Sequence, residues 1–357
     1  MSYDVSVIMP TARHDYSIMG MKDIHYLKPT LNSLCNQSFG DFELIIADGI
    51  YERRSVYHDF SKMPFDVKHV PVHPNHRFWL DRKRWAVCGT LNTGLIHADG
   101  ELVVRIDDCS EFDEGYLQRV WDGYQSGVWP LAMHIRYLEG KPARFDEEYR
   151  KKGYEAKYSE MIDKDRRFNI LNRMYGEGGI VRDTRFPIVE RMGGKMKAPH
   201  DWMYGYSCFT LEAALKVNGF DELFDGDKSL EDVDFGSRLD MAGYKDLFTL
   251  DVDHSVIEHE HEPIQEDVIE RGLKPIKCNY ALYLFNRYNM RWRANQTKLN
   301  QVDLAMIKKE TLKVPCVPAG WDEGKQFYDE DCEGELFKLW AENAPVFDLR
   351  MERFDLY

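Results

Sequence analysis

The chain has 357 residues, of which 43% are hydrophobic and 13% aromatic, so it can bury a large core and disorder is not expected. Its formal net charge of −14 argues against a general nucleic-acid binder, because a phosphate backbone attracts clustered Lys and Arg. The 7 cysteines are scattered without a C-x-x-C spacing, which favours reduced thiols over a disulfide framework or a cysteine zinc site.

The sequence shows no secretory leader and no apolar run long enough to span a membrane. We therefore expect a cytoplasmic protein, and peripheral contact with a membrane surface stays open.

Short β-branched runs alternate with helical patterns in the N-terminal part of the chain. Strands are expected at residues 5–9, 42–47, 67–72 and 101–106, and helices at residues 26–37 and 84–97. This alternation predicts an α/β fold with a mostly parallel sheet flanked by helices. Ligands bind such sheets beyond the carboxyl ends of the strands, where Pro10-Thr11, Asp48-Gly49 and Asp107-Asp108 are expected to lie.

The later part of the chain is less regular. Residues 130–200 are charged and weakly periodic, so we expect a variable, loop-rich insertion. Helices are expected at residues 211–217 and 230–242, each followed by a glycine that suits a left-handed cap, Gly219 and Gly243. The expected organisation is one domain at residues 1–264 and a mainly helical C-terminal extension at residues 265–357.

The first chemical motif is Asp107-Asp108, which directly follows an expected buried strand. Two adjacent carboxylates repel each other and lose hydration there, so a nearby cation would stabilise them. Mg²⁺ or Mn²⁺, which prefer oxygen ligands, would meet this need and would also bind a diphosphate. The alternative is that the two aspartates only cap the helix expected near Tyr116.

The second motif is Glu231-Asp232, at the start of an expected helix. An acceptor hydroxyl is a weak nucleophile and needs a positioned base, for which Asp232 is the candidate. The alternative is a capping arrangement between Ser229 and Asp232.

A third group of residues is Asp253-His254 with the acidic and histidine-rich run at residues 258–262. Imidazole is an acceptable ligand for Mn²⁺, so His259 is a candidate metal ligand. The alternative is a solvated acidic turn. Two basic clusters, Arg82-Lys83-Arg84 and the one from Arg287 to Arg293, suit either a solvated face or a diphosphate contact.

Taken in order, these pieces resemble the family-two glycosyltransferases of the GT-A fold, from Val5 to about His261. The resemblance rests on the runs at residues 5–11, 31–38, 42–49 and 91–101, on Asp107-Asp108-Cys109, on residues 218–222 and on Glu231-Asp232. It implies a GT-A catalytic domain at residues 1–264, with the insertion at about 130–200.

The resemblance also implies roles for individual residues. Pro10, Thr11, Asp48, Arg84 and Asp107 would bind the nucleotide-sugar donor, with UDP the expected nucleotide. Asp108 would bind Mn²⁺ or Mg²⁺, and His259 stays the candidate further ligand from the residue pattern given above. A common arginine of the family is replaced by Leu91, and Arg77, Arg82 or Arg84 could make its diphosphate contact.

The implied reaction is an inverting displacement in which Asp232, with Glu231 beside it, takes the proton of an acceptor hydroxyl on a glycan or other molecule. Two other functions stay open. A sugar-1-phosphate nucleotidyltransferase would normally have a glycine-rich basic loop at Pro10 to His14, which is absent. A non-catalytic carbohydrate-binding protein would not need both acidic pairs.

Overall fold

A computed structural model describes most of the chain. The described residues are 3–12, 24–56, 59–82, 86–137, 175–176, 180–183, 185–226, 230–258, 276–311, 337–341 and 346–356. Arg84, His259 and Ser229 therefore lie outside the described residues.

The first sheet has five strands in the order β10-β4-β1-β2-β3. They are β1 (Val5–Thr11), β2 (Phe42–Asp48), β3 (Asp66–Pro71), β4 (Leu102–Arg105) and β10 (Ser207–Thr210). The neighbours from β4 to β3 pair in parallel, and β10 pairs antiparallel with β4. The mostly parallel sheet expected from the sequence is confirmed.

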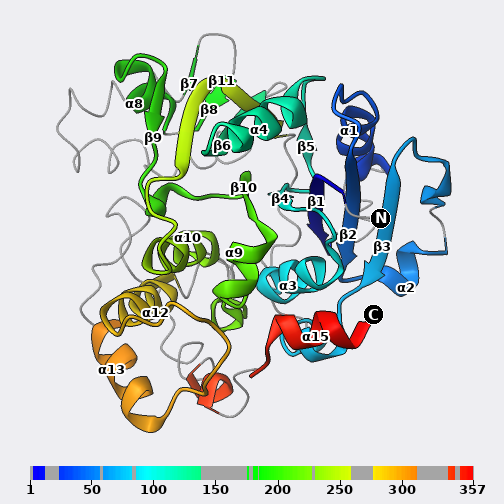
Figure 1. Cartoon of the computed structure of the whole chain (residues 1–357). Helices are drawn as coiled ribbons and strands as arrows, with labels where there is room; N and C mark the ends of the chain where they lie inside the picture. Colours follow the sequence, from blue (N-terminus) through cyan, green and yellow to red (C-terminus); the bar gives the residue numbers. More distant parts are fainter. Residues whose placement is uncertain are drawn as a thin grey trace, which may run out of the picture.

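Helices connect and cover these strands (Figure 1). They are α1 (Ile24–Cys35), α2 (Tyr51–Arg54), α3 (Val87–His97) and α4 (Tyr116–Gln125). Leu31 of α1, Leu91 and Leu95 of α3 and the strand side chains Val7 and Ile45 are buried in one hydrophobic core. The α/β fold with flanking helices, predicted from the alternating pattern of the sequence, is thus confirmed.

A second sheet follows the order β5-β11-β6-β8-β7, with β9 paired to β11. Its strands are β5 (Ser110–Glu111), β6 (Trp129–Tyr137), β7 (Tyr175–Gly176), β8 (Ile180–Arg182), β9 (Lys195–Lys197) and β11 (Phe248–Glu258). Several of these, with α8 (Phe186–Arg191), fall inside the expected loop-rich insertion. Its described part is more regular than expected, because elements this short leave no periodic signal.

Two helices lead toward the C-terminal region, α9 (Leu211–Lys216) and α10 (Glu231–Met241). Positive φ angles of 61° at Asn218 and 69° at Gly219 end α9, and one of 100° at Gly243 follows α10, so both expected caps are confirmed. A side chain on Gly219 would also collide with Asn92, since its Cβ would lie 2.2 Å from Oδ1 of Asn92.

The C-terminal helices are α12 (Ile276–Tyr288), α13 (Gln301–Thr311) and α15 (Leu349–Leu356). Helix α12 packs against α10 and carries α13, and α15 packs on α3 (Figure 1). The described part of the C-terminal segment therefore docks on the preceding α/β part of the chain. No described helix has the length and apolar character needed to cross a membrane.

Candidate active site

Four of the expected site residues meet at the carboxyl edge of the first sheet. Thr11 ends β1 opposite Asp48, which ends β2, and Pro10 is the neighbour of Thr11. Beyond β4, the Thr11 hydroxyl donates a 2.7 Å hydrogen bond to Oδ2 of Asp108. The topology thus brings together carboxylates that are far apart in sequence, because parallel strands end at one edge.

Asp48 is fully buried, and both of its carboxylate oxygens have partners. Arg54 Nε donates to Oδ2 at 2.7 Å, and Nε2 of His69 lies 2.8 Å from the same oxygen. The Ile50 N–H donates to Oδ1 at 2.9 Å. The buried Arg54 also reaches the Thr11 hydroxyl at 3.4 Å. Thr11 therefore connects this ion pair to Asp108.

The second acidic pair lies at the start of α10. Leu230 occupies the N-cap position with a left-handed φ of 71° and makes no side-chain cap. Asp232 has 17% of its side chain exposed, and its Oδ1 accepts a 2.8 Å hydrogen bond from the Val233 N–H. A left-handed conformation is strained for a leucine, and such strain is concentrated at functional sites.

Arg105, the last residue of β4, lies between the two acidic pairs. Its Nη2 is 3.7 Å from Oε1 of Glu231, and its Nη1 is 4.0 Å from Oδ2 of Asp232. The guanidinium is buried, and within the described part of the chain its Nε and Nη1 have no hydrogen-bond partner. The negative charges of Asp107, Asp232 and Glu231 outweigh the cost of burial and raise the pKa of Arg105.

Asp232 has a pKa suited to a general base. Burial raises its pKa to about 7, the charge of Glu231 adds to the rise, and Arg105 opposes it. A base with a pKa near the working pH is present in both forms and can take a proton and return it. The same burial makes the ionised form costly, so the site keeps a carboxylate that accepts protons readily.

Asp107 occupies space that a glycine leaves open. A Cβ on Gly205 would lie 2.7 Å from Oδ2 of Asp107. Close by, the Ser110 hydroxyl donates to the Tyr206 hydroxyl oxygen at 2.9 Å. Burial raises the pKa of Tyr206 well above its usual value, and Asp107 and Glu258 contribute to the rise. Asp107 and Glu258 therefore both act on the buried Tyr206 hydroxyl.

Strand β11 brings the start of the third motif, the acidic and histidine-rich run that begins at Glu258, close to Asp108. Glu258, at the end of β11, pairs with Ser110 of β5, two positions beyond Asp108. His259 follows directly but lies outside the described residues, and so does Arg84. His254 is buried in a stack on Tyr116, with ring centroids 4.8 Å apart and planes at 7°, and burial lowers its pKa to about 3. His254 therefore serves as a neutral packing residue.

Asp107 and Asp108 provide oxygen ligands of the kind that Mg²⁺ and Mn²⁺ prefer. Thr11 donates a hydrogen bond to Asp108, as a group that orients a metal ligand would. Among the described residues, no third His, Cys, Asp or Glu completes a tight three-residue cluster with this pair. The two carboxylates are of the kind that a hard dication prefers, and they would supply only part of its coordination.

A cavity of about 680 Å³ opens beside Asp232. The residues that line it come from the loop before β10, the start of α10 and helix α12: Asp201, Tyr204, Leu230, Glu231, Asp232, Val233, Tyr280, Tyr283, Leu284, Arg287 and Tyr288. Arg185 lies 4.4 Å from the ring centroid of Tyr204 and forms a buried ion pair with Asp183. Four tyrosines thus surround the opening next to the candidate base.

The arginines that could replace the family's diphosphate contact have local partners. Arg77 Nε pairs with Asp81 at 3.1 Å, and the Arg82 guanidinium lies 3.8 Å from the Phe78 ring centroid. Arg287, from the second basic cluster, donates to the Ser237 hydroxyl at 2.9 Å and lines the cavity.

Sequence reasoning missed Arg105 and the tyrosines of the cavity. A basic residue in an otherwise apolar strand, two positions before Asp107, was the available signal for Arg105. Tyr280 and Tyr283 carried no local signal, because their role depends on how α12 packs against α10.

The model of the glycosyl transferase family 2 matches residues 6–184 of the chain. No curated protein is similar enough to the sequence to count as a match. A crystal structure of S. aureus TarS 1–349 aligns over 99% of this chain and 89% of that chain, with 13% identity and a TM-score of 0.47. The same protein in complex with UDP-GlcNAc aligns over the same shares, with 13% identity and a TM-score of 0.49. Similarity at this level says nothing about what this chain binds.

Proposed function

The chain belongs to glycosyl transferase family 2, whose model covers half of it, and we propose that it transfers a sugar from a nucleotide-diphosphate donor to a hydroxyl group. The proposed donor is a UDP-sugar, and the proposed acceptor is a glycan or another hydroxyl compound. The observation that carries the proposal is the placement of Asp232, which lines a tyrosine-rich cavity and lies 4.0 Å from Arg105 at the end of β4.

Asp232 is the proposed general base. An acceptor hydroxyl in the cavity would give its proton to the Asp232 carboxylate as its oxygen attacks the anomeric carbon. The bond from that carbon to the nucleotide diphosphate breaks in the same step, which inverts the configuration. The raised pKa of about 7 supports this role, because a carboxylate of ordinary pKa would be a weaker proton acceptor.

The donor would lie against the strand ends. Asp107 and Asp108 would hold Mn²⁺ or Mg²⁺, with His259 a proposed further ligand. A divalent ion bound there supplies positive charge for the departing diphosphate. Thr11 would keep the Asp108 carboxylate in place through its 2.7 Å hydrogen bond. Pro10, Asp48 and Arg84 remain proposed donor contacts, and Asp48 would act from within its ion pair with Arg54.

Arg105 separates the donor side from the acceptor side. Its positive charge lies within 4.0 Å of the Asp232 carboxylate and limits the rise in that group's pKa. Without this charge the pKa of Asp232 would rise further, because Arg105 opposes the effects of burial and of Glu231. We therefore assign Arg105 the role of keeping Asp232 ionisable near neutral pH.

The acceptor would enter beside the tyrosines. Aromatic faces and hydroxyls together suit a sugar ring, which has apolar C–H faces and a polar rim. Tyr280 is 40% exposed, so its ring is accessible to a ligand. Tyr204 is held in place by Arg185 beneath it. This surface supports a carbohydrate acceptor, with Asp232 in the wall of the cavity to receive its proton.

The direct test is release of nucleoside diphosphate from UDP-, GDP- and dTDP-sugars, with and without Mn²⁺ and a mixture of oligosaccharide acceptors. The wild-type chain is expected to turn over one class of donor. The Asp232→Asn variant should lose ~10²–10⁴-fold in turnover while it keeps donor-dependent thermal stabilisation. The matched control is Asp240→Asn, a carboxylate later in α10 that does not line the cavity.

The outcomes separate the alternatives. Release of pyrophosphate from a nucleoside triphosphate and a sugar phosphate would instead identify a nucleotidyltransferase. Oligosaccharide binding without release from any donor would identify a non-catalytic binding protein. Near-wild-type turnover by Asp232→Asn would rule out Asp232 as the base.

A further inference from the structure

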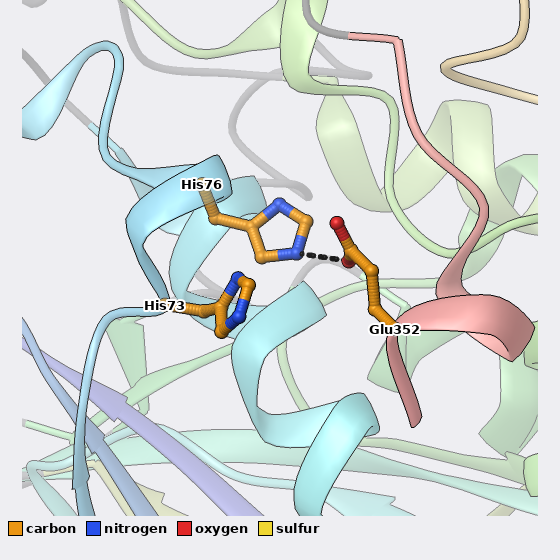
Figure 2. Close-up of side chains that lie close together, drawn as sticks. All are labelled: His73, His76 and Glu352. Carbon is orange, nitrogen blue, oxygen red and sulfur yellow. Dashed lines mark hydrogen bonds and ion pairs between the residues drawn. The ribbon is translucent and has the colours of Figure 1, made fainter. Parts of the chain in front are cut away.

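A second cluster of possible metal ligands lies apart from the candidate active site. It consists of His73, His76 and Glu352, and Figure 2 shows His76 bound to the Glu352 carboxylate with the His73 ring beside them. His73 is the N-cap of the short helix η3 (Pro74–His76), and His76 is its last residue. Glu352 comes from α15. One ligand atom from each residue lies within 4.8 Å of the others. None of the three lines the cavity beside Asp232.

Neighbouring groups orient each of these side chains. Nδ1 of the buried His76 lies 2.6 Å from Oε1 of Glu222, so an N–H at this position donates to that carboxylate. That leaves Nε2 of His76 facing Oε2 of Glu352, at 2.9 Å. Asn75 Nδ2 donates to the other oxygen of Glu352 at 2.7 Å. A histidine whose second nitrogen donates to a carboxylate is the usual arrangement around protein-bound zinc.

His73 can also provide a lone pair. Its Nδ1 accepts a long, 3.4 Å hydrogen bond from the Asn75 N–H, a weak bond that a metal ion could replace. Tetrahedral ligands around zinc are about 3.4 Å apart, given bonds of about 2.0–2.2 Å. The three side chains therefore need only small rotations to close around one ion.

The charges of the cluster favour a dication. The buried His76 ring lies between two carboxylates, with Nδ1 2.6 Å from Oε1 of Glu222 and Nε2 2.9 Å from Oε2 of Glu352. Within the described residues, Oε2 of the buried Glu222 has no hydrogen-bond partner. A divalent ion bound to a neutral His76 would balance both negative charges.

We propose that His73, His76 and Glu352 bind one Zn²⁺-type transition-metal ion that fastens α15 to the core of the protein. Two imidazole nitrogens and one carboxylate oxygen suit Zn²⁺ or Co²⁺ better than Mg²⁺, which prefers oxygen ligands. Glu222 completes the arrangement as the acceptor of the His76 N–H. The site is structural, since α15 packs on α3 and joins the end of the chain to the catalytic half.

The test uses the full chain, stripped with a chelator and kept in excess Mg²⁺ so that Asp107 and Asp108 are occupied. Titration with Co²⁺ should give an intense visible absorption with one equivalent bound, as tetrahedral nitrogen-containing sites do. One equivalent of Zn²⁺ should abolish that absorption and raise the melting temperature by on the order of 5 °C.

His73→Asn is the discriminating variant. Its side-chain oxygen can still accept from the Asn75 N–H, and the His76–Glu352 ion pair is untouched, so stability without metal should be unchanged. The Co²⁺ absorption and the Zn²⁺-dependent stabilisation should both be lost. The matched control is His97→Asn, a partly buried histidine at the end of α3 that should keep both.

A lack of Co²⁺ absorption in the wild-type chain would overturn the proposal. So would a His73→Asn variant that keeps the absorption and the stabilisation. Either result would identify the cluster as a metal-free ion-pair bridge through His76. The readouts do not depend on sugar transfer, so they stand whether or not the proposed activity is found.

Discussion

Arg105 at the end of β4 points at Asp232 at the start of α10, with Nη1 4.0 Å from Oδ2. The pair joins the strand that leads to Asp107-Asp108 with the helix that carries the candidate base. Its separation is too long for a strong hydrogen bond, so its effect on Asp232 is mainly electrostatic.

The pH dependence of transfer should follow the charges around Asp232. Because its pKa is raised to about 7 and the base acts when ionised, kcat/KM is expected to fall below about pH 7. Glu231→Gln removes a charge that raises this pKa and should move the fall to lower pH. Arg105→Gln removes a charge that lowers it and should move the fall to higher pH. The pH profiles of kcat/KM for the three proteins should show the fall at the lowest pH in Glu231→Gln and at the highest pH in Arg105→Gln. Identical profiles would contradict this role of the two charges.

Asp232 should also lower stability at alkaline pH. Its folded-state pKa lies above the unfolded value, so the folded chain binds the extra proton. The associated stability is fully present below about pH 4 and is lost as the pH rises through about 7. The free energy of unfolding of Asp232→Asn should therefore exceed that of wild type by about 1–4 kcal/mol at pH 8 and match it near pH 4. Denaturant unfolding at the two pH values measures this difference. Asp240→Asn is the control. Equal stability of Asp232→Asn and wild type at pH 8 would contradict the raised pKa of Asp232.

The Thr11 hydroxyl should tune metal use through Asp108. Thr11→Val removes the 2.7 Å hydrogen bond to Asp108 and should raise the Mn²⁺ concentration for half-maximal turnover by ~10- to 100-fold. Thr11→Ser keeps a hydroxyl and should restore the wild-type requirement. Turnover measured against Mn²⁺ concentration checks this. A Thr11→Val variant with an unchanged Mn²⁺ requirement would show that Thr11 does not influence metal binding.

Changes to the tyrosines of the cavity should weaken acceptor binding and leave donor binding unchanged. Tyr280→Ala removes an exposed ring of the cavity and should raise the acceptor KM by roughly 2- to 10-fold, with an unchanged donor KM. Tyr280→Phe keeps the ring and should stay near wild type. Phe354→Ala, which truncates a 77% exposed ring on α15, is the control. A rise in the donor KM would place the donor, not the acceptor, in this cavity.

Much of the fold was readable from the sequence because its signals are local. The buried runs that became β1, β2 and β4 and the glycines after α9 and α10 fix the backbone within a few residues. The same local pattern located Asp107-Asp108 at a strand end and Glu231-Asp232 at a helix start. The assignment of these pairs to a glycosyltransferase followed from their order along the chain, and the family match confirms the family.

Tertiary structure decided what these groups experience. The pKa of Asp232 depends on burial and on Arg105, and Asp48 is tied up by Arg54 and His69, none of which a sequence pattern reports. His76 and Glu352 are 276 positions apart in sequence and form an ion pair only because α15 packs on α3. Electrostatic energies depend on distance and burial, and both arise from packing between remote segments. The sequence by itself therefore determined which residues are available for the chemistry, and the packing decided which of them act together.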